Sequence, residues 1–257
     1  MLSDRGRVRR HNEDACSAAP LHNVFVVCDG MGGAAGGEIA SHLAAETFVA
    51  HLSQSRAQNG AQPSRIQSHT AAALQAANRA VYQQSRKTPH LSGMGTTLVG
   101  LVYAAPHDPT SDEHAPPALW LVHVGDSRCY RWRGKRLEPL TVDHSLVEEQ
   151  VRAGQITAAQ ALESPMRNVI TRAVGTEPTV EPEIEGHSPK AGDLYLLSSD
   201  GLTRELSDDE IARILCRVPA ELTQAALQTA CRQLVQAANQ WGGNDNITVL
   251  LVGFVPA

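Results

Sequence analysis

The stretch of sequence that decides the fold is Val24-Phe25-Val26-Val27-Cys28-Asp29-Gly30-Met31-Gly32-Gly33. Five apolar residues, three of them β-branched, run into an aspartate and a glycine. Short apolar runs of this kind are typical of buried strands. We therefore expect a strand over residues 24–28 that ends at Asp29. A single Asp-Gly pair after a strand indicates only a turn, because both residues tolerate turn geometry.

The same succession, an apolar run next to an aspartate, recurs at three more places: Leu121–Val124 before Asp126, Tyr195–Leu197 before Asp200 and, in reverse order, Asp245 before Ile247–Leu251. Glu13 and Asp14 add carboxylates near the start. If neighbouring strands bring these ends together, the carboxylates stay ionised only beside hard cations. Oxygen ligands favour Mg²⁺ or Mn²⁺ over zinc. A residue without Cβ, such as Gly30, lets a backbone carbonyl approach such an ion closely.

Composition describes an ordinary globular protein of 257 residues, with 42% hydrophobic and 19% charged residues. The net charge of −5 argues against general affinity for nucleic acid or an anionic membrane. The five cysteines are scattered without CxxC spacing, and we interpret them as reduced thiols. The first residues do not form a signal peptide, and no segment is apolar enough to span a membrane, so we expect a cytoplasmic protein.

Periodicity predicts a mixed α and β fold in one domain over residues 1–257. The predicted strands span residues 24–28, 96–103, 119–124, 194–198 and 247–254, and the predicted helices span residues 38–53, 64–86 and 222–240. Residues 106–117 are interpreted as a solvated hairpin loop rather than a metal site. Residues 145–172 are interpreted as a helical excursion, interrupted at Gly154 and Pro165, that could form a lid.

Six motifs together resemble the protein phosphatase 2C family, the metal-dependent PPM class, in its compact bacterial form. In chain order they are Gly6–Asp14, Cys28–Gly33, Met94–Thr97, Val124–Tyr130, Ser199–Thr203 and Gly243–Thr248. Their order and spacing match over about residues 3–254, whereas any one motif alone would be weak evidence. The resemblance implies an α+β fold: a four-layer α-β-β-α sandwich of two antiparallel sheets flanked by helices, with a small helical lid, or flap, at about residues 145–172.

The resemblance also implies a centre of two Mn²⁺ or Mg²⁺ ions between the sheets. Asp29 would bridge the two ions, the Gly30 carbonyl would bind one of them, and Asp200 and Asp245 would complete the other. Asp14, together with Glu13, would orient water. Asp126 resembles the residue that bacterial members use for a third, weaker ion beside the flap; the alternative for Asp126 is a plain turn residue.

Arg9 falls on the family's phosphate-binding arginine. A planar guanidinium grips phosphate oxygens by paired hydrogen bonds and stays charged. The alternative is a surface arginine in the basic run of residues 5–10, with Arg7 as the nearest competitor. The implied catalytic set is Arg9, Asp14 and Asp29. No cysteine lies in a phosphate-cradling loop, which argues against a thiolate mechanism.

The chain departs from the family pattern at two places. Ala34 stands where many members carry a histidine that can protonate the leaving alkoxide, so slow turnover of phosphoserine is expected unless water, His11 or His144 supplies the proton. A structural or surface role is the alternative for both histidines. The second departure is the short stretch before Gly6, which fits an abbreviated edge strand or a start downstream of the true one.

The sequence thus predicts a serine/threonine protein phosphatase that hydrolyses phosphoserine and phosphothreonine by metal-activated water. Its expected partners are phosphorylated proteins, including a cognate kinase, and a monomer is expected. One alternative is a non-catalytic relative that binds a phosphoprotein or kinase. Another is a hydrolase of small phosphoesters, which would share the chemistry and differ only in its substrate surface.

Overall fold

The computed structural model describes residues 1–32, 36–59, 63–104 and 118–255. The strands are β1 Leu2–Asp4, β2 Asp14–Ala19, β3 Val24–Met31, β4 Gly95–Thr96, β5 Leu98–Tyr103, β6 Leu119–Val124, β7 Arg128–Arg133, β8 Arg136–Pro139, β9 Glu183–His187, β10 Leu194–Ser198 and β11 Ile247–Gly253. The α-helices are α1 Gly36–Asn59, α2 Pro63–Lys87, α3 Leu146–Arg152, α4 Ala158–Glu163, α5 Asp200–Thr203, α6 Asp208–Leu215 and α7 Gln224–Trp241.

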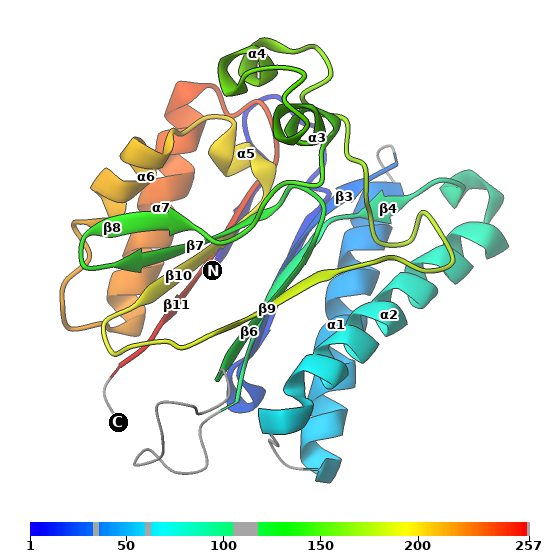
Figure 1. Ribbon diagram of the computed structural model, residues 1–257, viewed down its shortest axis with the longest axis horizontal. Coiled ribbons are helices and arrows are strands. Elements are labelled where there is room, and N and C mark those ends of the chain that lie inside the picture. The colour runs from blue at the N-terminus through cyan, green and yellow to red at the C-terminus, as the bar shows by residue number, and fades with distance from the viewer. Residues whose placement is uncertain (33–35, 60–62, 105–117, 256–257) are drawn as a thin grey trace.

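The strands form two antiparallel sheets. One has the order β1-β11-β10-β7-β8, and the other has the order β2-β3-β5-β6-β9, with β4 paired to β3. Helices α1 and α2 cover the outer face of the β3 sheet, and α6 and α7 cover the outer face of the β10 sheet (Figure 1). The four-layer α-β-β-α sandwich predicted from the sequence is therefore confirmed.

The continuous apolar runs arise because each central strand is buried on both faces. Along β3, Val26 belongs to the core beneath α1 and α2, whereas its neighbour Val27 belongs to the core between the sheets. Along β10, Leu196 packs toward α6 and α7, and Leu197 packs between the sheets. Successive side chains of a strand point to opposite faces, so both faces must be apolar.

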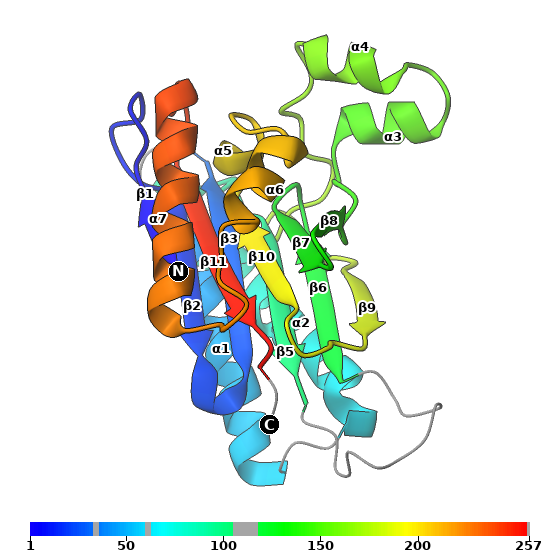
Figure 2. The ribbon, with the colours of Figure 1, turned by 90° about the vertical axis from the view of Figure 1, so that its left-hand side faces the viewer.

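Topology brings the aspartate-bearing strand ends together. Strands β3 and β6 both pair antiparallel with β5, so they run in the same direction and finish at the same edge of their sheet. Strands β10 and β11 are antiparallel, so the end of β10 and the start of β11 share an edge of the other sheet. The flap helices α3 and α4 lie at this end of the sandwich (Figure 2).

The flap begins and ends at one short bridge, in which Ser145 pairs antiparallel with Ile170. Helix α3 ends shortly before Gly154, which adopts a φ of +69°, and α4 ends shortly before Pro165. The interruptions expected from the sequence therefore coincide with the helix ends. The hairpin loop predicted at residues 106–117 lies outside the described residues.

The central strands and long helices match their predicted positions, although β3 and α1 extend further than predicted. Sequence reasoning missed β2, β7, β8 and β9, whereas β1 is a short edge strand of the kind considered for the stretch before Gly6. Within the described ranges, no helix combines the length and apolar character that crossing a lipid bilayer requires.

Candidate metal centre

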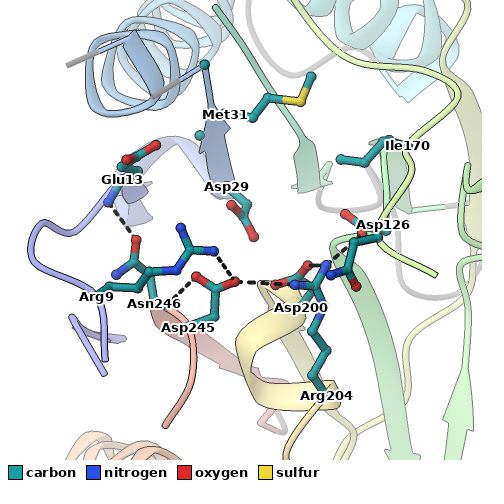
Figure 3. Close-up of a pocket in the computed structure, with 13 residues that line it drawn as sticks. Arg9, Glu13, Asp29, Met31, Asp126, Ile170, Asp200, Arg204, Asp245 and Asn246 are labelled. Atoms are coloured by element: carbon teal, nitrogen blue, oxygen red, sulfur yellow. Dashed lines mark hydrogen bonds and ion pairs between the residues drawn. The ribbon is translucent and has the colours of Figure 1, made fainter. Parts of the chain in front are cut away.

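A pocket of about 350 Å³ opens at the edge where the strand ends meet. Four aspartates line it, one from each of the strand ends described above: Asp29, Asp126, Asp200 and Asp245. Figure 3 shows them with Arg9 on one side and Arg204 on the other. The structure thus brings together the aspartates that the sequence singled out as metal ligands.

Asp29 is held in place through its backbone. Its N–H donates to Thr97 Oγ1 at 2.9 Å, and its carbonyl accepts from Thr96 Oγ1 at 2.8 Å and from the Thr97 N–H at 2.8 Å. Thr97 Oγ1 in turn lies 2.6 Å from Ser127 Oγ. Two adjacent threonines therefore fix the peptide of Asp29, which explains the Gly95-Thr96-Thr97 motif in physical terms.

Two glycines next to the aspartates permit close backbone packing. A Cβ on Gly30 would lie 2.1 Å from the Gly37 carbonyl oxygen, and a Cβ on Gly201 would lie 2.0 Å from the Asn246 carbonyl oxygen. Real Cβ atoms do not approach backbone oxygens so closely. Any side chain at either position would push an aspartate-bearing turn away from the pocket.

Asp14 lies behind the pocket rather than in its lining. It pairs in register with Asp29 across β2 and β3, and only 3% of its surface is exposed. Its Oδ2 accepts a hydrogen bond from the Ser199 hydroxyl at 2.7 Å, whereas the buried Oδ1 has no partner in the part of the chain that the structure describes. Burial raises the pKa of Asp14 to about 6.

The carboxylates repel one another and are poorly solvated. Burial, and then the charges of Asp14 and Asp200, raise the pKa of Asp29 well above its usual range. Burial raises the pKa of Asp200 in the same way, with Asp126 as the next cause. Among the described residues, none forms a hydrogen bond with the buried Asp126 Oδ1 or Asp200 Oδ1. Buried acceptors that lack donors and repel one another suit divalent cations.

Three carboxylate oxygens do not converge on a single point here. Within the described chain, no three acidic side chains of this pocket have oxygens that all lie within 4.8 Å of one another. Mg²⁺ and Mn²⁺ accept such a set, because Mg²⁺ keeps several waters and needs only one or two carboxylates. The donor set, carboxylates plus the Gly30 carbonyl, is all oxygen, as hard cations require. The residues therefore fit these ions.

Arg9 lines the pocket and Arg7 does not. Arg9 Nη2 donates to Asp245 Oδ2 at 2.8 Å, and half of the Arg9 side-chain surface is exposed. The guanidinium thus stands beside the aspartates with donors free toward solvent, which favours Arg9 over Arg7 as the phosphate-binding group.

Asn246, for which the sequence suggested no role, fastens the loop that carries Arg9. Its Oδ1 accepts from the Glu13 N–H at 2.8 Å, and its Nδ2 donates to the carbonyls of Arg5 and His11, each at 2.9 Å. Only 4% of Asn246 is exposed. One buried amide therefore holds both ends of the N-terminal loop, an arrangement between distant segments that no local pattern reveals.

The Glu13 carboxylate points away from the four aspartates (Figure 3). A Cβ on Gly37 would lie 2.0 Å from Glu13 Oε2, so the carboxylate rests against the first turn of α1. A helix N-terminus is a favourable place for negative charge. Burial raises the pKa of Glu13. In this conformation Glu13 interacts with the helix rather than with the centre of the pocket.

Arg204 is a pocket residue that sequence reasoning missed. It follows α5 and contacts Asp200, four residues earlier. Its Nη1 lies 3.3 Å from Asp245 Oδ2, and its Nη2 lies 3.7 Å from Asp126 Oδ2. Side chains four residues apart on a helix are neighbours. The spacing between Asp200 and Arg204 was therefore a signal that the sequence offered.

A second cluster lies at the base of the flap, where the rings of His123 and His144 stack with centroids 4.6 Å apart. His123 Nε2 donates to the Val142 carbonyl at 3.0 Å, and His144 Nδ1 accepts from the Gly125 N–H at 3.1 Å. Burial lowers the pKa of both histidines. Each neutral ring therefore carries its proton on Nε2, which leaves no lone pair there for a metal. His144 Nε2 instead lies 3.1 Å from Glu183 Oε1.

The proton donors considered in the sequence do not reach the pocket. Neither His11 nor His144 belongs to its lining within the described chain. His144 is buried in the flap-base cluster, which fits the structural alternative. Ala34, where the sequence departs from the family pattern, lies outside the described residues.

Comparison with known proteins then decides the family. A sequence model described as protein phosphatase 2C matches residues 5–238. The chain belongs to the protein phosphatase 2C family. The resemblance inferred from the six motifs is therefore confirmed.

Two bacterial relatives of this phosphatase 2C chain show how far the similarity extends. Serine/threonine protein phosphatase PstP of Mycobacterium tuberculosis is 37% identical over 98% of this chain but only 44% of its own length. The chain thus spans less than half of that relative. Serine/threonine phosphatase stp of Listeria monocytogenes is 34% identical over 97% of this chain and 93% of its own length.

A solved phosphatase 2C structure agrees with the fold described above. The catalytic domain of PstP, in complex with two manganese ions, superposes with a TM-score of 0.77 at 33% identity. The match covers 99% of this chain and 96% of that structure.

Proposed function

We propose that this chain hydrolyses phosphoserine and phosphothreonine in proteins at a centre of two Mn²⁺ or Mg²⁺ ions. The observation that carries the proposal is the convergence of four aspartates beside Arg9 in one open pocket. Asp29, the Gly30 carbonyl, Asp200 and Asp245 would hold the ions, with Asp29 at the centre of the set. When bound, the ions would supply a water of lowered pKa and neutralise charge on the phosphoryl group.

The side chains around the pocket have separate tasks in this proposal. Arg9 would hold phosphoryl oxygens, because its half-exposed guanidinium carries donors beyond those used by Asp245. Such donors stabilise the charge that gathers on these oxygens as the phosphoester bond breaks. Asp14, whose Oδ1 lacks a partner, would orient water from behind Asp29. Glu13 would take part in orienting water only if its side chain turned away from α1.

Phosphorylated proteins are the substrates that the relatives' names favour. We infer that a cognate kinase is among them, and that the chain acts as a monomer in the cytoplasm. A non-catalytic phosphoprotein-binding relative is the alternative from a different class. The four aspartates count against it, because a pure binding module gains nothing from repulsion among buried carboxylates.

The test is phosphate release by metal-stripped protein from a phosphothreonine peptide and from an aryl phosphate, with added Mn²⁺ or with EDTA. Asp200→Asn is the test variant, and Asp209→Asn, an exposed residue on α6, is its matched control. The proposal predicts peptide hydrolysis that needs metal and is lost only in Asp200→Asn. Metal binding without turnover would favour the binding module, and hydrolysis confined to the aryl phosphate would favour a small-phosphoester hydrolase.

A further inference from the structure

The Arg204 guanidinium lies among the carboxylates at which the family resemblance implies a third metal ion. Its guanidinium lies within 4 Å of oxygens from three aspartates: Asp126, Asp200 and Asp245 (Figure 3). Only 30% of its side-chain surface is exposed. The guanidinium therefore contacts a group of three carboxylates rather than a single acid.

Arg204 contacts one oxygen of each of two carboxylates and leaves the other oxygen available to a metal ion. Arg204 approaches Oδ2 of Asp126 and Oδ2 of Asp200, whereas Oδ1 of each residue is buried and forms no hydrogen bond with any residue that the structure describes. Asp200 can thus give Oδ1 to one of the two proposed ions while Arg204 keeps Oδ2. Asp126 is not a ligand of the two proposed ions, so Arg204 already supplies a positive charge beside it, and a third ion at Asp126 Oδ1 would bring a further positive charge close to the guanidinium.

A guanidinium is well suited to replace a weakly held ion. It keeps its charge at all physiological pH values and presents five donors to acidic oxygens. It is also tethered to α5, so its local concentration at the site exceeds that of a dilute free ion. Asp126 thereby gains a permanent cationic partner.

Arg204 lies where the metal pocket meets the space under the flap. A second cavity of about 320 Å³ is lined by Arg204 and Asp126 on one side and by the flap residues Val147, Val151 and Leu162 on the other. The third position that the family resemblance implies would lie beside the flap, which is the side that Arg204 occupies.

We propose that Arg204 is a built-in substitute for the third cation, so that this chain holds two divalent ions rather than three. The proposal rests on the two-ion centre proposed above. It assigns Asp126 to Arg204 as an ion-pair partner, in place of the weak metal ligand suggested by the family resemblance.

The test is a calorimetric titration of metal-stripped protein with MnCl₂, which counts bound ions without measuring activity. We expect two ions for the wild type and for Asp126→Asn, and a third, weaker ion for Arg204→Met. Arg204→Lys should keep two ions, because it keeps the charge. Arg213→Met, an exposed position on α6, is the matched control and should also keep two.

The outcomes separate this inference from the proposed function. Three ions in the wild type, with one lost in Asp126→Asn, would overturn the role of Arg204 and leave the two-ion centre intact. Two ions in both the wild type and Arg204→Met would overturn it as well. No bound ion in any of the proteins would instead contradict the proposed centre itself. The comparison of the wild type with Asp126→Asn can still overturn the inference if Arg204→Met does not fold.

Discussion

Arg9 Nη2 lies 2.8 Å from Asp245 Oδ2, an ion pair that joins the N-terminal loop to the residue that precedes β11 by two positions. The two residues are 236 positions apart in the sequence. Half of the Arg9 side-chain surface is exposed, so the pair contributes little to stability. Its consequence is positional: it sets a guanidinium at the rim of the aspartate pocket, where a phosphoryl group would be gripped.

Replacement of Arg9 should therefore impair substrate binding and turnover while leaving the fold intact. We expect Arg9→Ala to lower kcat/KM roughly 10- to 100-fold, the usual effect of losing charge-assisted hydrogen bonds. Inhibition by inorganic phosphate should weaken in parallel, and Arg9→Lys should restore part of both effects. Arg10→Ala, an exposed neighbour outside the pocket lining, should behave as the wild type. Equal effects at both positions would argue against Arg9 as the phosphate-binding group.

Removing the charge of Asp29, at the centre of the aspartate pocket, should lower phosphatase activity but raise the thermal stability of the metal-free protein. Burial and the surrounding carboxylates raise the pKa of Asp29, so its charge destabilises the metal-free fold. Asp29→Asn should abolish detectable phosphatase activity and yet raise the Tm measured in EDTA. Asp209→Asn should change neither quantity. A lower Tm for Asp29→Asn in EDTA would show that the cluster is not under electrostatic strain.

The metal-free protein should lose stability as pH rises through the pKa of Asp14. Burial raises that pKa from an ordinary value near 3.8 to about 6, so the folded state binds the proton more tightly than the unfolded chain does. The stabilising contribution of the proton is complete at low pH and is lost between about pH 4 and pH 6. Asp14→Asn should therefore gain up to roughly 3 kcal/mol over the wild type at pH 7.5, the equivalent of about two pKa units.

Urea denaturation in EDTA at several pH values measures this difference directly. The advantage of Asp14→Asn should shrink as pH falls and vanish only below about pH 3, where the wild-type carboxyl is protonated in both the folded and the unfolded state. An advantage that stays constant across the pH range would mean that the effect has a cause other than the charge of Asp14.

Removal of the Asn246 amide should loosen the loop that carries Arg9. Asn246→Ala loses three hydrogen bonds from a buried side chain, so we expect destabilisation of about 2–3 kcal/mol together with a higher KM. Asn239→Ala, which loses a single hydrogen bond to Asp4 away from the pocket, should be milder and leave KM unchanged. Comparable KM values in the two variants would contradict a positioning role for Asn246.

The apolar pattern of the sequence predicted those strands and helices whose own residues indicate which faces are buried. Strands β3, β10 and β11 are apolar on both faces, and the helices α2 and α7 carry apolar residues along one face over many turns. Strand β7, Arg128–Arg133, contains three arginines, and β9, Glu183–His187, lies at a sheet edge with only one apolar side chain. Such strands form because a neighbouring strand offers hydrogen bonds, which a single segment does not reveal.

The aspartates of the site could be predicted for the same reason, since each one adjoins an apolar run. Residues that support the aspartates through contacts between distant parts of the chain could not be predicted from the sequence. Ser199 holds Asp14 across 185 positions, and Thr97 holds Asp29 across 68. Arg204 is the exception, because its partner Asp200 lies one helical turn away.

The measurement that tests the central claim most directly is the dependence of phosphothreonine hydrolysis on Mn²⁺ concentration, recorded for the wild type, Asp29→Asn and Asp209→Asn after metal removal. We predict no hydrolysis without metal, saturating activation in the wild type and in Asp209→Asn, and no recovery of Asp29→Asn at any Mn²⁺ concentration. Hydrolysis in EDTA, or a wild-type response from Asp29→Asn, would contradict the assignment of the aspartate pocket as the catalytic metal centre.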